Sequence, residues 1–219
     1  MIQTIASFFV VVSSIFSIPA RTQAAPIPIP EAPKPIVIAP IKKTEPTVPF
    51  YSQFKDIDAP EWKKVGCGVA SLAMIVNYYQ PDAVSVNTLL KRGIASGAYL
   101  NNVGWTYKGL ISLSNRYNLA GESYDLAKIG SKAAFAQFEA QLKNGPVIAS
   151  VHYKFEPQNP IPHLVVINKI ENDTLYYNDP AAQTGSKTIS VADFVKAWKK
   201  RYIVIRPLEK NDKLALARI

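Results

Sequence analysis

Cys67, the only cysteine of the chain, stands between two glycines and just before an apolar run at residues 69–79. That run is apolar on nearly every helical face, which predicts a buried helix beginning close to the cysteine. The positive field of a helix N-terminus lowers the pKa of a thiol and favours the reactive thiolate. Because glycine allows a sharp backbone turn, the pattern indicates an uncrowded nucleophile at a helix start. The alternative is a small buried cysteine that packs like alanine.

A cysteine nucleophile needs a base to accept its proton, and the chain contains two histidines, His152 and His163. His163 opens the predicted strand 164–170 after a proline-rich turn, so its ring can lie at the edge of a cleft. His152 lies inside another predicted strand, where a hydrogen-bonded structural histidine is the favoured interpretation. Asp179 ends the predicted strand 174–178, and in a hairpin its carboxylate would meet His163 and orient the ring. Alternatively, Asp179 only starts a turn before a proline.

The elements that must position these residues change in type at Pro146. Before it the pattern is helical, with a glycine- and asparagine-rich connection at residues 93–104, and the helices are expected to begin at the capping residues Ser85, Thr106 and Ser131. After it the β-rich runs predict strands at residues 147–153, 164–170, 174–178, 187–189 and 202–205. Ser190 starts a capping box before a helix that includes Trp198. Helices first and antiparallel strands second predict an α+β fold.

Composition divides the chain into four predicted segments. Residues 1–24 resemble a secretory signal peptide, with cleavage expected after Ala24, and residues 25–47 form a proline-rich spacer. Residues 48–207 form the globular domain, and residues 208–219 form a basic C-terminal tail. The expected location is therefore secreted or attached to the cell envelope. No lysine or arginine precedes the apolar stretch, so an uncleaved N-terminal anchor is the alternative.

The formal net charge of +9 favours weak adhesion to an anionic cell-wall polymer or membrane surface. Lysine and arginine are scattered along the chain and form no surface that would read a nucleic acid, so no nucleic-acid partner is expected. Two histidines and one cysteine make a poor metal site, and no phosphate-binding glycine loop is present. The sequence predicts neither a metal nor a cofactor, and it favours no particular oligomeric state.

Several short motifs, taken together in their order and spacing, resemble the papain-like cysteine peptidases of the double-glycine (bacteriocin) leader peptidase type, specifically their stand-alone secreted relatives. These motifs are Val48-Pro49-Phe50-Tyr51-Ser52-Gln53, Gly66-Cys67-Gly68-Val69-Ala70-Ser71, Gly145-Pro146-Val147-Ile148, His163-Leu164-Val165-Val166-Ile167 and Asn178-Asp179-Pro180. The resemblance implies a papain-like fold with N-terminal helices packed on an antiparallel sheet. It also implies a triad of Cys67, His163 and Asp179, a peptide or protein substrate, and Gln53 as a donor to the oxyanion.

The expected activity is thiol-dependent cleavage of a peptide or amide bond. His163 would deprotonate Cys67, whose thiolate would attack the carbonyl carbon. The side-chain amide of Gln53 and the backbone N–H of Cys67 would hold the developing oxyanion, and water would then release the acyl group. Two alternatives are transfer of the acyl group to an amine or thiol by the same triad, and a wall-binding module without turnover.

Overall fold

The computed structural model describes residues 47–101 and 103–208. The predicted signal peptide, all but the last residue of the proline-rich spacer, and all but the first residue of the basic tail lie outside these residues. The longer helices of the described part are α1 (Cys67–Tyr79), α2 (Val86–Ala95), α3 (Tyr107–Ser114), α4 (Ser131–Leu142) and α5 (Val191–Ala197), and the 3₁₀ turns are η1 (Pro60–Trp62), η2 (Asn115–Tyr117) and η3 (Tyr153–Phe155). Its strands are β1 (Tyr99–Leu100), β2 (Gly104–Trp105), β3 (Leu119–Asp125), β4 (Val147–His152), β5 (Pro162–Glu171), β6 (Thr174–Asn178), β7 (Lys187–Ser190) and β8 (Trp198–Pro207).

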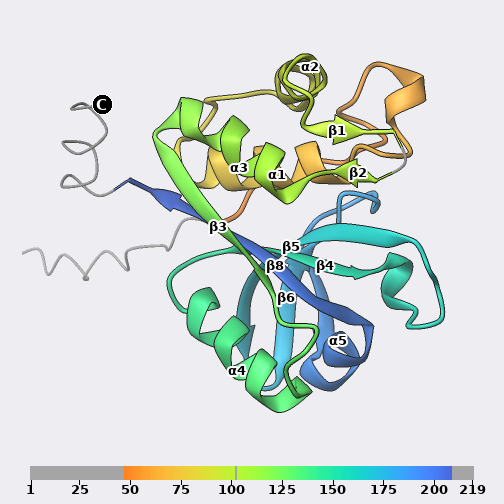
Figure 1. Cartoon of the computed structure of the whole chain (residues 1–219), viewed down its shortest axis with the longest axis vertical. Coiled ribbons are helices and arrows are strands. Elements are labelled where there is room, and N and C mark those ends of the chain that lie inside the picture. The colour runs from red at the N-terminus through yellow and green to blue at the C-terminus, as the bar shows by residue number, and fades with distance from the viewer. Residues whose placement is uncertain (1–46, 102, 209–219) are drawn as a thin grey trace, which may run out of the picture. The chain divides into compact units, whose positions relative to one another are not determined.

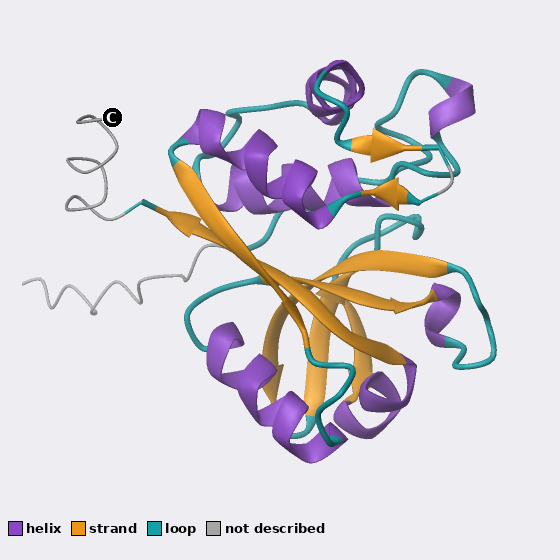
Figure 2. Ribbon diagram, in the orientation of Figure 1, coloured by secondary structure: helices purple, strands orange, loops and turns teal. Residues whose placement is uncertain are grey.

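The predicted α+β fold is confirmed: helices pack on a six-stranded antiparallel sheet of order β3-β8-β4-β5-β6-β7 (Figure 1). Helices α1, α2 and α3 lie on one side of the sheet, and α4 and α5 lie on the other (Figure 2). Successive strand residues point to opposite faces, so each strand contributes to both cores. On β5, Leu164 and Val166 pack in the α1 core, whereas Val165 and Ile167 pack in the α4 core.

Helix α1 runs through the interior, as its apolar sequence predicted, and residues 68–77 are all buried. Its packing against β5 is fixed at one point by a hydrogen bond from the Ser71 hydroxyl to the Leu164 carbonyl, at 3.3 Å. Ser71 is one turn from the start of the helix. The first turn of α1 is therefore held beside the beginning of β5.

The predicted hairpin of β5 and β6 is also confirmed, with Val166 opposite Asn178. Asn172 and Asp173 make the turn with φ values of 48° and 59°, in the left-handed region that these two residue types tolerate best after glycine. The hairpin brings the end of β6 back beside the beginning of β5. His163, near the start of β5, and Asp179, directly after β6, are thereby placed next to each other at the open end of the hairpin.

The structure corrects four details of the sequence prediction. Strand β3 was not predicted, because its residues are mostly exposed and do not alternate. Trp198 begins β8 rather than ending the preceding helix. Ser131 is the first residue of α4 and does not cap it, since Gly130 is the N-cap and provides no side-chain bond. The connection at residues 93–104 contains the end of α2 and the hairpin of β1 with β2.

The predicted caps at Ser85, Thr106 and Ser190 are present, each accepting a hydrogen bond from a backbone N–H in the first turn of its helix. Within residues 47–101 and 103–208, no helix has both the length and the hydropathy needed to cross a bilayer.

Candidate active site

Cys67 is the first residue of α1, and its surroundings are closely packed around both neighbouring glycines. A Cβ on Gly66 would lie 2.1 Å from Ile57 Cδ1, and one on Gly68 would lie 2.7 Å from Trp105 Cγ. Gly66 has a φ of −79°, which any residue can adopt. Glycine at this position therefore avoids a steric clash, and it does not make the sharp turn expected from the sequence. The thiol side chain itself is half-buried.

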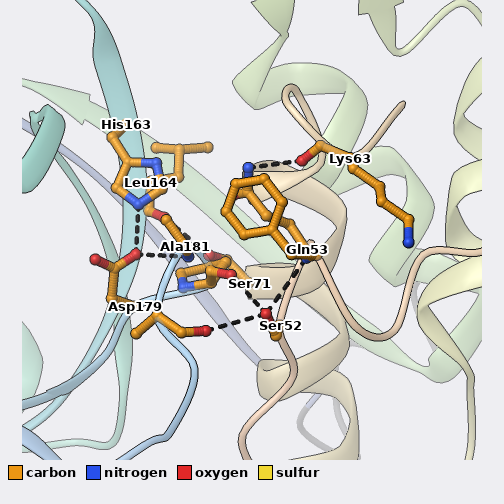
Figure 3. A network of polar contacts seen from close by, with 11 residues as sticks. Ser52, Gln53, Lys63, Ser71, His163, Leu164, Asp179 and Ala181 are labelled. Atoms are coloured by element: carbon orange, nitrogen blue, oxygen red, sulfur yellow. Dashed lines mark hydrogen bonds and ion pairs between the residues drawn. The ribbon is translucent and has the colours of Figure 1, made fainter. Parts of the chain in front are cut away.

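His163 and Asp179 face each other across the β5–β6 hairpin (Figure 3). The Nε2 atom of His163 lies 2.6 Å from Oδ1 of Asp179, and only 3% of His163 is exposed. The same carboxylate oxygen accepts the backbone N–H of Ala181 at 2.8 Å. Two donors thus hold the carboxylate in place. With Nε2 bound to Asp179, Nδ1 is the ring nitrogen that remains for the thiol.

The Cys67 thiol and the His163 imidazole shift each other's pKa. Burial by itself raises the pKa of the thiol, but a hydrogen bond and the positive charge of His163 outweigh it and lower this pKa below its ordinary value. Burial likewise lowers the pKa of His163, but hydrogen bonds with Asp179 and Cys67 raise it to about 9. Between these two pKa values the stable form is a thiolate beside an imidazolium, which is the reactive form of a cysteine nucleophile.

A tyrosine ring packs against the imidazole. The ring centroids of Tyr153 and His163 are 5.3 Å apart, with an interplanar angle of 89°. This arrangement is a favourable edge-to-face contact, and it restricts rotation of the imidazole. Tyr153 lies in the 3₁₀ turn after β4, directly before Lys154 and Phe155, whose φ values of 59° and 57° are both positive.

Gln53 reaches the same region from the N-terminal segment of the domain. Its Nε2 donates to the carbonyl of Lys63 at 2.8 Å, and its backbone N–H donates to the carbonyl of Pro180, also at 2.8 Å. Its Oε1 is buried without a hydrogen-bond partner. An amide nitrogen carries two hydrogens, and the Lys63 carbonyl takes one of them. The second N–H of Gln53 is therefore available to a ligand.

The segment that carries Gln53 is tied to the loop that follows Asp179 (Figure 3). The hydroxyl of Ser52 donates to the carbonyl of Ala182 at 3.0 Å, and its backbone N–H donates to Asp56. The bond to Ala182 links residues that are far apart in sequence, and the bond to Asp56 holds the Ser52 backbone in place. Any displacement of the loop after β6 would therefore move both Asp179 and Gln53.

Cys67, His163 and Gln53 line one pocket of about 1060 Å³. Asp179 is not part of the pocket wall and lies behind the imidazole. The structure thus brings together all four residues that the sequence proposed for the site. His152 is not in the pocket wall, and its Nδ1 lies 2.6 Å from the Asn159 carbonyl.

Sequence reasoning did not single out several residues that line this pocket: Tyr107, Asp125, Ser150, Tyr153, Lys199 and Arg201. One signal was present for Ser150, which is the only polar residue in the apolar run 147–151. It is 3% exposed, and its side chain interacts with that of Tyr107. The positions of Asp125, Lys199 and Arg201 depend on strand pairings that no local pattern reveals. Among the residues described, no group of three or more His, Cys, Asp or Glu side chains is arranged to hold a metal ion.

Two solved structures with a similar fold come from transporters. One is a double-glycine motif protease from an AMS/PCAT transporter in complex with its leader peptide, with a TM-score of 0.51 and 21% identity over 76% of this chain and 96% of the other. A second is the peptidase domain of Streptococcus ComA, a bifunctional ABC transporter of a quorum-sensing pathway. It has a TM-score of 0.51 and 19% identity over 66% of this chain and 93% of the other.

A related sequence is the pediocin PA-1 transport/processing ATP-binding protein PedD of Pediococcus acidilactici, which is 28% identical over 144 residues. That alignment covers 66% of this chain and 18% of PedD, so the chain spans less than a fifth of this relative. Residues 45–205, well over half of the chain, match the Peptidase_C39 like family. The chain therefore belongs to the Peptidase_C39 like family.

Proposed function

We propose that this peptidase hydrolyses a peptide or amide bond with Cys67 as nucleophile and His163 as base. Asp179 orients the imidazole and stabilises its charge, and it does not enter the pocket. The observation that carries the proposal is the buried 2.6 Å contact of His163 with Asp179, beside a thiol of lowered pKa in a pocket wall. A cysteine that only filled space would not need an imidazole held by a carboxylate.

In the proposed reaction the thiolate attacks the scissile carbonyl carbon, and the carbonyl oxygen becomes an oxyanion. The second N–H of the Gln53 amide and the backbone N–H of Cys67, which is unpaired in the first turn of a helix, donate to this oxygen. The His163 imidazolium gives its proton to the leaving amine. Water, deprotonated by the same imidazole, then releases the acyl group and restores the thiol.

A peptide substrate is supported by the walls of the pocket and by a relative. Val103 and Ile161 line the pocket although they are 68% and 55% exposed, and such apolar side chains are suited to contact those of a bound chain. The double-glycine motif protease of similar fold was solved in complex with a leader peptide. The proposed substrate class is therefore a peptide or a peptide segment of a protein.

The proposal predicts that Gln53→Ala lowers kcat by about 10²- to 10³-fold, as loss of one oxyanion donor does in other hydrolases. Alkylation of Cys67 by iodoacetamide should keep its pH profile in this variant, because the amide acts on the substrate and not on the resting thiolate. Cleavage of a peptide library, followed by mass spectrometry, measures turnover, and Cys67→Ala gives the background.

Product analysis with and without an added amine distinguishes hydrolysis from acyl transfer. Full turnover in Cys67→Ala would contradict the proposal, and unchanged wall binding in that variant would favour a binding module.

We also propose that the chain is exported, on the basis of the apolar stretch within residues 1–24 and the small residues Thr22 and Ala24 before the expected cleavage site. The precursor is expected to lose its first 24 residues, which N-terminal sequencing of extracellular protein measures. Met1 found intact on membrane-bound protein would instead establish an uncleaved anchor. The net charge of +9 supports adhesion of the exported protein to anionic wall polymers.

A further inference from the structure

A row of four side chains crosses the sheet on the face that packs against α1, the helix that begins at Cys67. Leu164 on β5 is opposite Ser150 on β4, Ser150 is opposite Arg201 on β8, and Arg201 is opposite Asp125 on β3. Directly opposite residues of antiparallel strands lie on the same face, and Leu164 packs in the α1 core. All four side chains line the pocket that contains Cys67. The pocket therefore extends from the hairpin of His163 to the edge strand β3.

Arg201 is the cationic member of this row. Its Nε donates to Oδ2 of Asp125 at 2.9 Å, and 42% of its side chain is exposed. This is the one hydrogen bond that the guanidinium makes to the residues of 47–101 and 103–208. A guanidinium has five N–H donors in a planar fork, so its two terminal nitrogens keep an edge that matches a second carboxylate.

A bulge in β8 adds a second cation beside Arg201. Pairing with β4 passes from Arg201 directly to Trp198, so that Lys199 and Lys200 have no partner on β4. Lys200 has a φ of 54°, and its Nζ donates to the Ile129 carbonyl at 2.9 Å. Lys199 lines the pocket, and its ammonium has no hydrogen-bond or ion-pair partner in the described part of the chain. Bulges commonly redirect a side chain next to an active site.

We infer that Arg201, together with Lys199, determines specificity by binding a carboxylate of the peptide substrate. This inference rests on the proposed peptidase function. Asp125 is the one carboxylate among the described residues that line the pocket, against the two cations Arg201 and Lys199, so this end of the pocket has an excess of positive charge. The carboxylate that it binds is either an Asp or Glu side chain or the C-terminus of the substrate, because both present the same pair of oxygens.

The strand spacing gives the position of that carboxylate in the substrate. Arg201 lies two strands away from Leu164, which follows His163 directly, and two spacings span about 10 Å. An extended peptide advances about 3.3 Å per residue. The acidic group is therefore expected about three residues from the bond that Cys67 attacks.

Thiol-reactive peptides test this inference without requiring turnover, because Cys67 is the only cysteine. Bromoacetyl-Ala-Ala-Glu-amide extends from the thiol in one chain direction, and the chloromethyl ketone of Glu-Ala-Ala extends in the other. Each is compared with its Gln counterpart, and the free-acid form of the bromoacetyl-Ala-Ala-Gln peptide tests a C-terminal carboxylate. Iodoacetamide, which carries no peptide, gives the reference rate for each protein variant.

In one of the two chain directions, the Glu reagent is expected to alkylate the wild-type protein about fivefold faster than its Gln counterpart. A ratio of this size corresponds to a partly exposed charge-assisted contact. This ratio should fall to one in Arg201→Gln and should decrease with added salt. Arg116→Gln is the matched control, since Arg116 is exposed and lies outside the pocket wall, and it should keep the wild-type ratio.

Equal rates for acidic and neutral reagents in both directions, with Cys67 alkylated, would overturn the inference and leave the peptidase proposal intact. A preference that survives Arg201→Gln but disappears in Lys64→Gln would also overturn it, because Lys64 is another cation of the pocket wall. A Cys67 inert to iodoacetamide in the folded protein would overturn the proposed function and this inference together.

Discussion

Replacing His163 by alanine is expected to lower kcat/KM by about 10²- to 10⁴-fold, the usual effect of losing a general acid and base. The same change should raise the pKa of Cys67. Burial of the thiol, which raises its pKa, would remain, while the hydrogen bond and charge of the imidazole that now lower it would be gone. Alkylation by iodoacetamide at several pH values measures this directly, and its low-pH inflection should move to higher pH.

His152→Ala is the matched control for this prediction. The Nδ1 of His152 contacts the Asn159 carbonyl at 2.6 Å, so the loss of its ring should lower the free energy of unfolding by about 1 kcal/mol. Neither the alkylation profile nor kcat should change markedly, because His152 lies outside the pocket wall. A reactive, unshifted Cys67 in His163→Ala, combined with an inert one in His152→Ala, would reverse the assignment of the base.

The parts of the fold that local chemistry determines could be predicted from the sequence. The caps at Ser85 and Thr106 are examples, because a side-chain oxygen there accepts an N–H from only three residues away. Strand β3 could not be predicted in this way. It pairs Leu119 with Pro207, and its exposed residues include Gly121 and Glu122, which have little tendency to form strands by themselves. Its conformation depends on β8, which is distant in sequence.

The residues of the candidate site also differ in whether the local sequence predicts their positions. The meeting of His163 with Asp179 follows from a hairpin with a short turn, so it could be predicted once the two strands were assigned. The approach of Arg201 to the same pocket depends on the pairing of β8 with β4 and on the bulge at Lys199. Nothing in the local pattern around residue 201 indicates that bulge. The meeting of the proposed base and its carboxylate was therefore accessible from sequence, and the opposite end of the pocket was not.

Asp179→Asn is expected to lower kcat/KM less than His163→Ala does. It should also shift the alkaline limit of the pH range in which kcat/KM is high to a lower pH. Asparagine keeps an oxygen where the carboxylate accepts two N–H donors, from His163 and Ala181, and these donors select the oxygen over the amide nitrogen. The orientation of the ring should therefore survive. The negative charge is lost, so the pKa of His163 should fall below its wild-type value of about 9. The alkaline limb of the profile of kcat/KM against pH measures this fall in the pKa of His163.

The pH dependence of the free energy of unfolding gives an independent measure of the effect of the Asp179 charge on His163. The folded-state pKa of His163 is about 9, above its ordinary value of 6.5, so its interactions stabilise the fold fully below pH 6.5. That contribution is lost as the pH rises from 6.5 to about 9. Asp179→Asn should diminish this pH dependence of the free energy of unfolding. Asp173→Asn should retain it, because this exposed residue lies at the other end of β6, in a turn that asparagine tolerates. Identical pH profiles for Asp179→Asn and the wild type would show that the carboxylate does not hold the imidazolium.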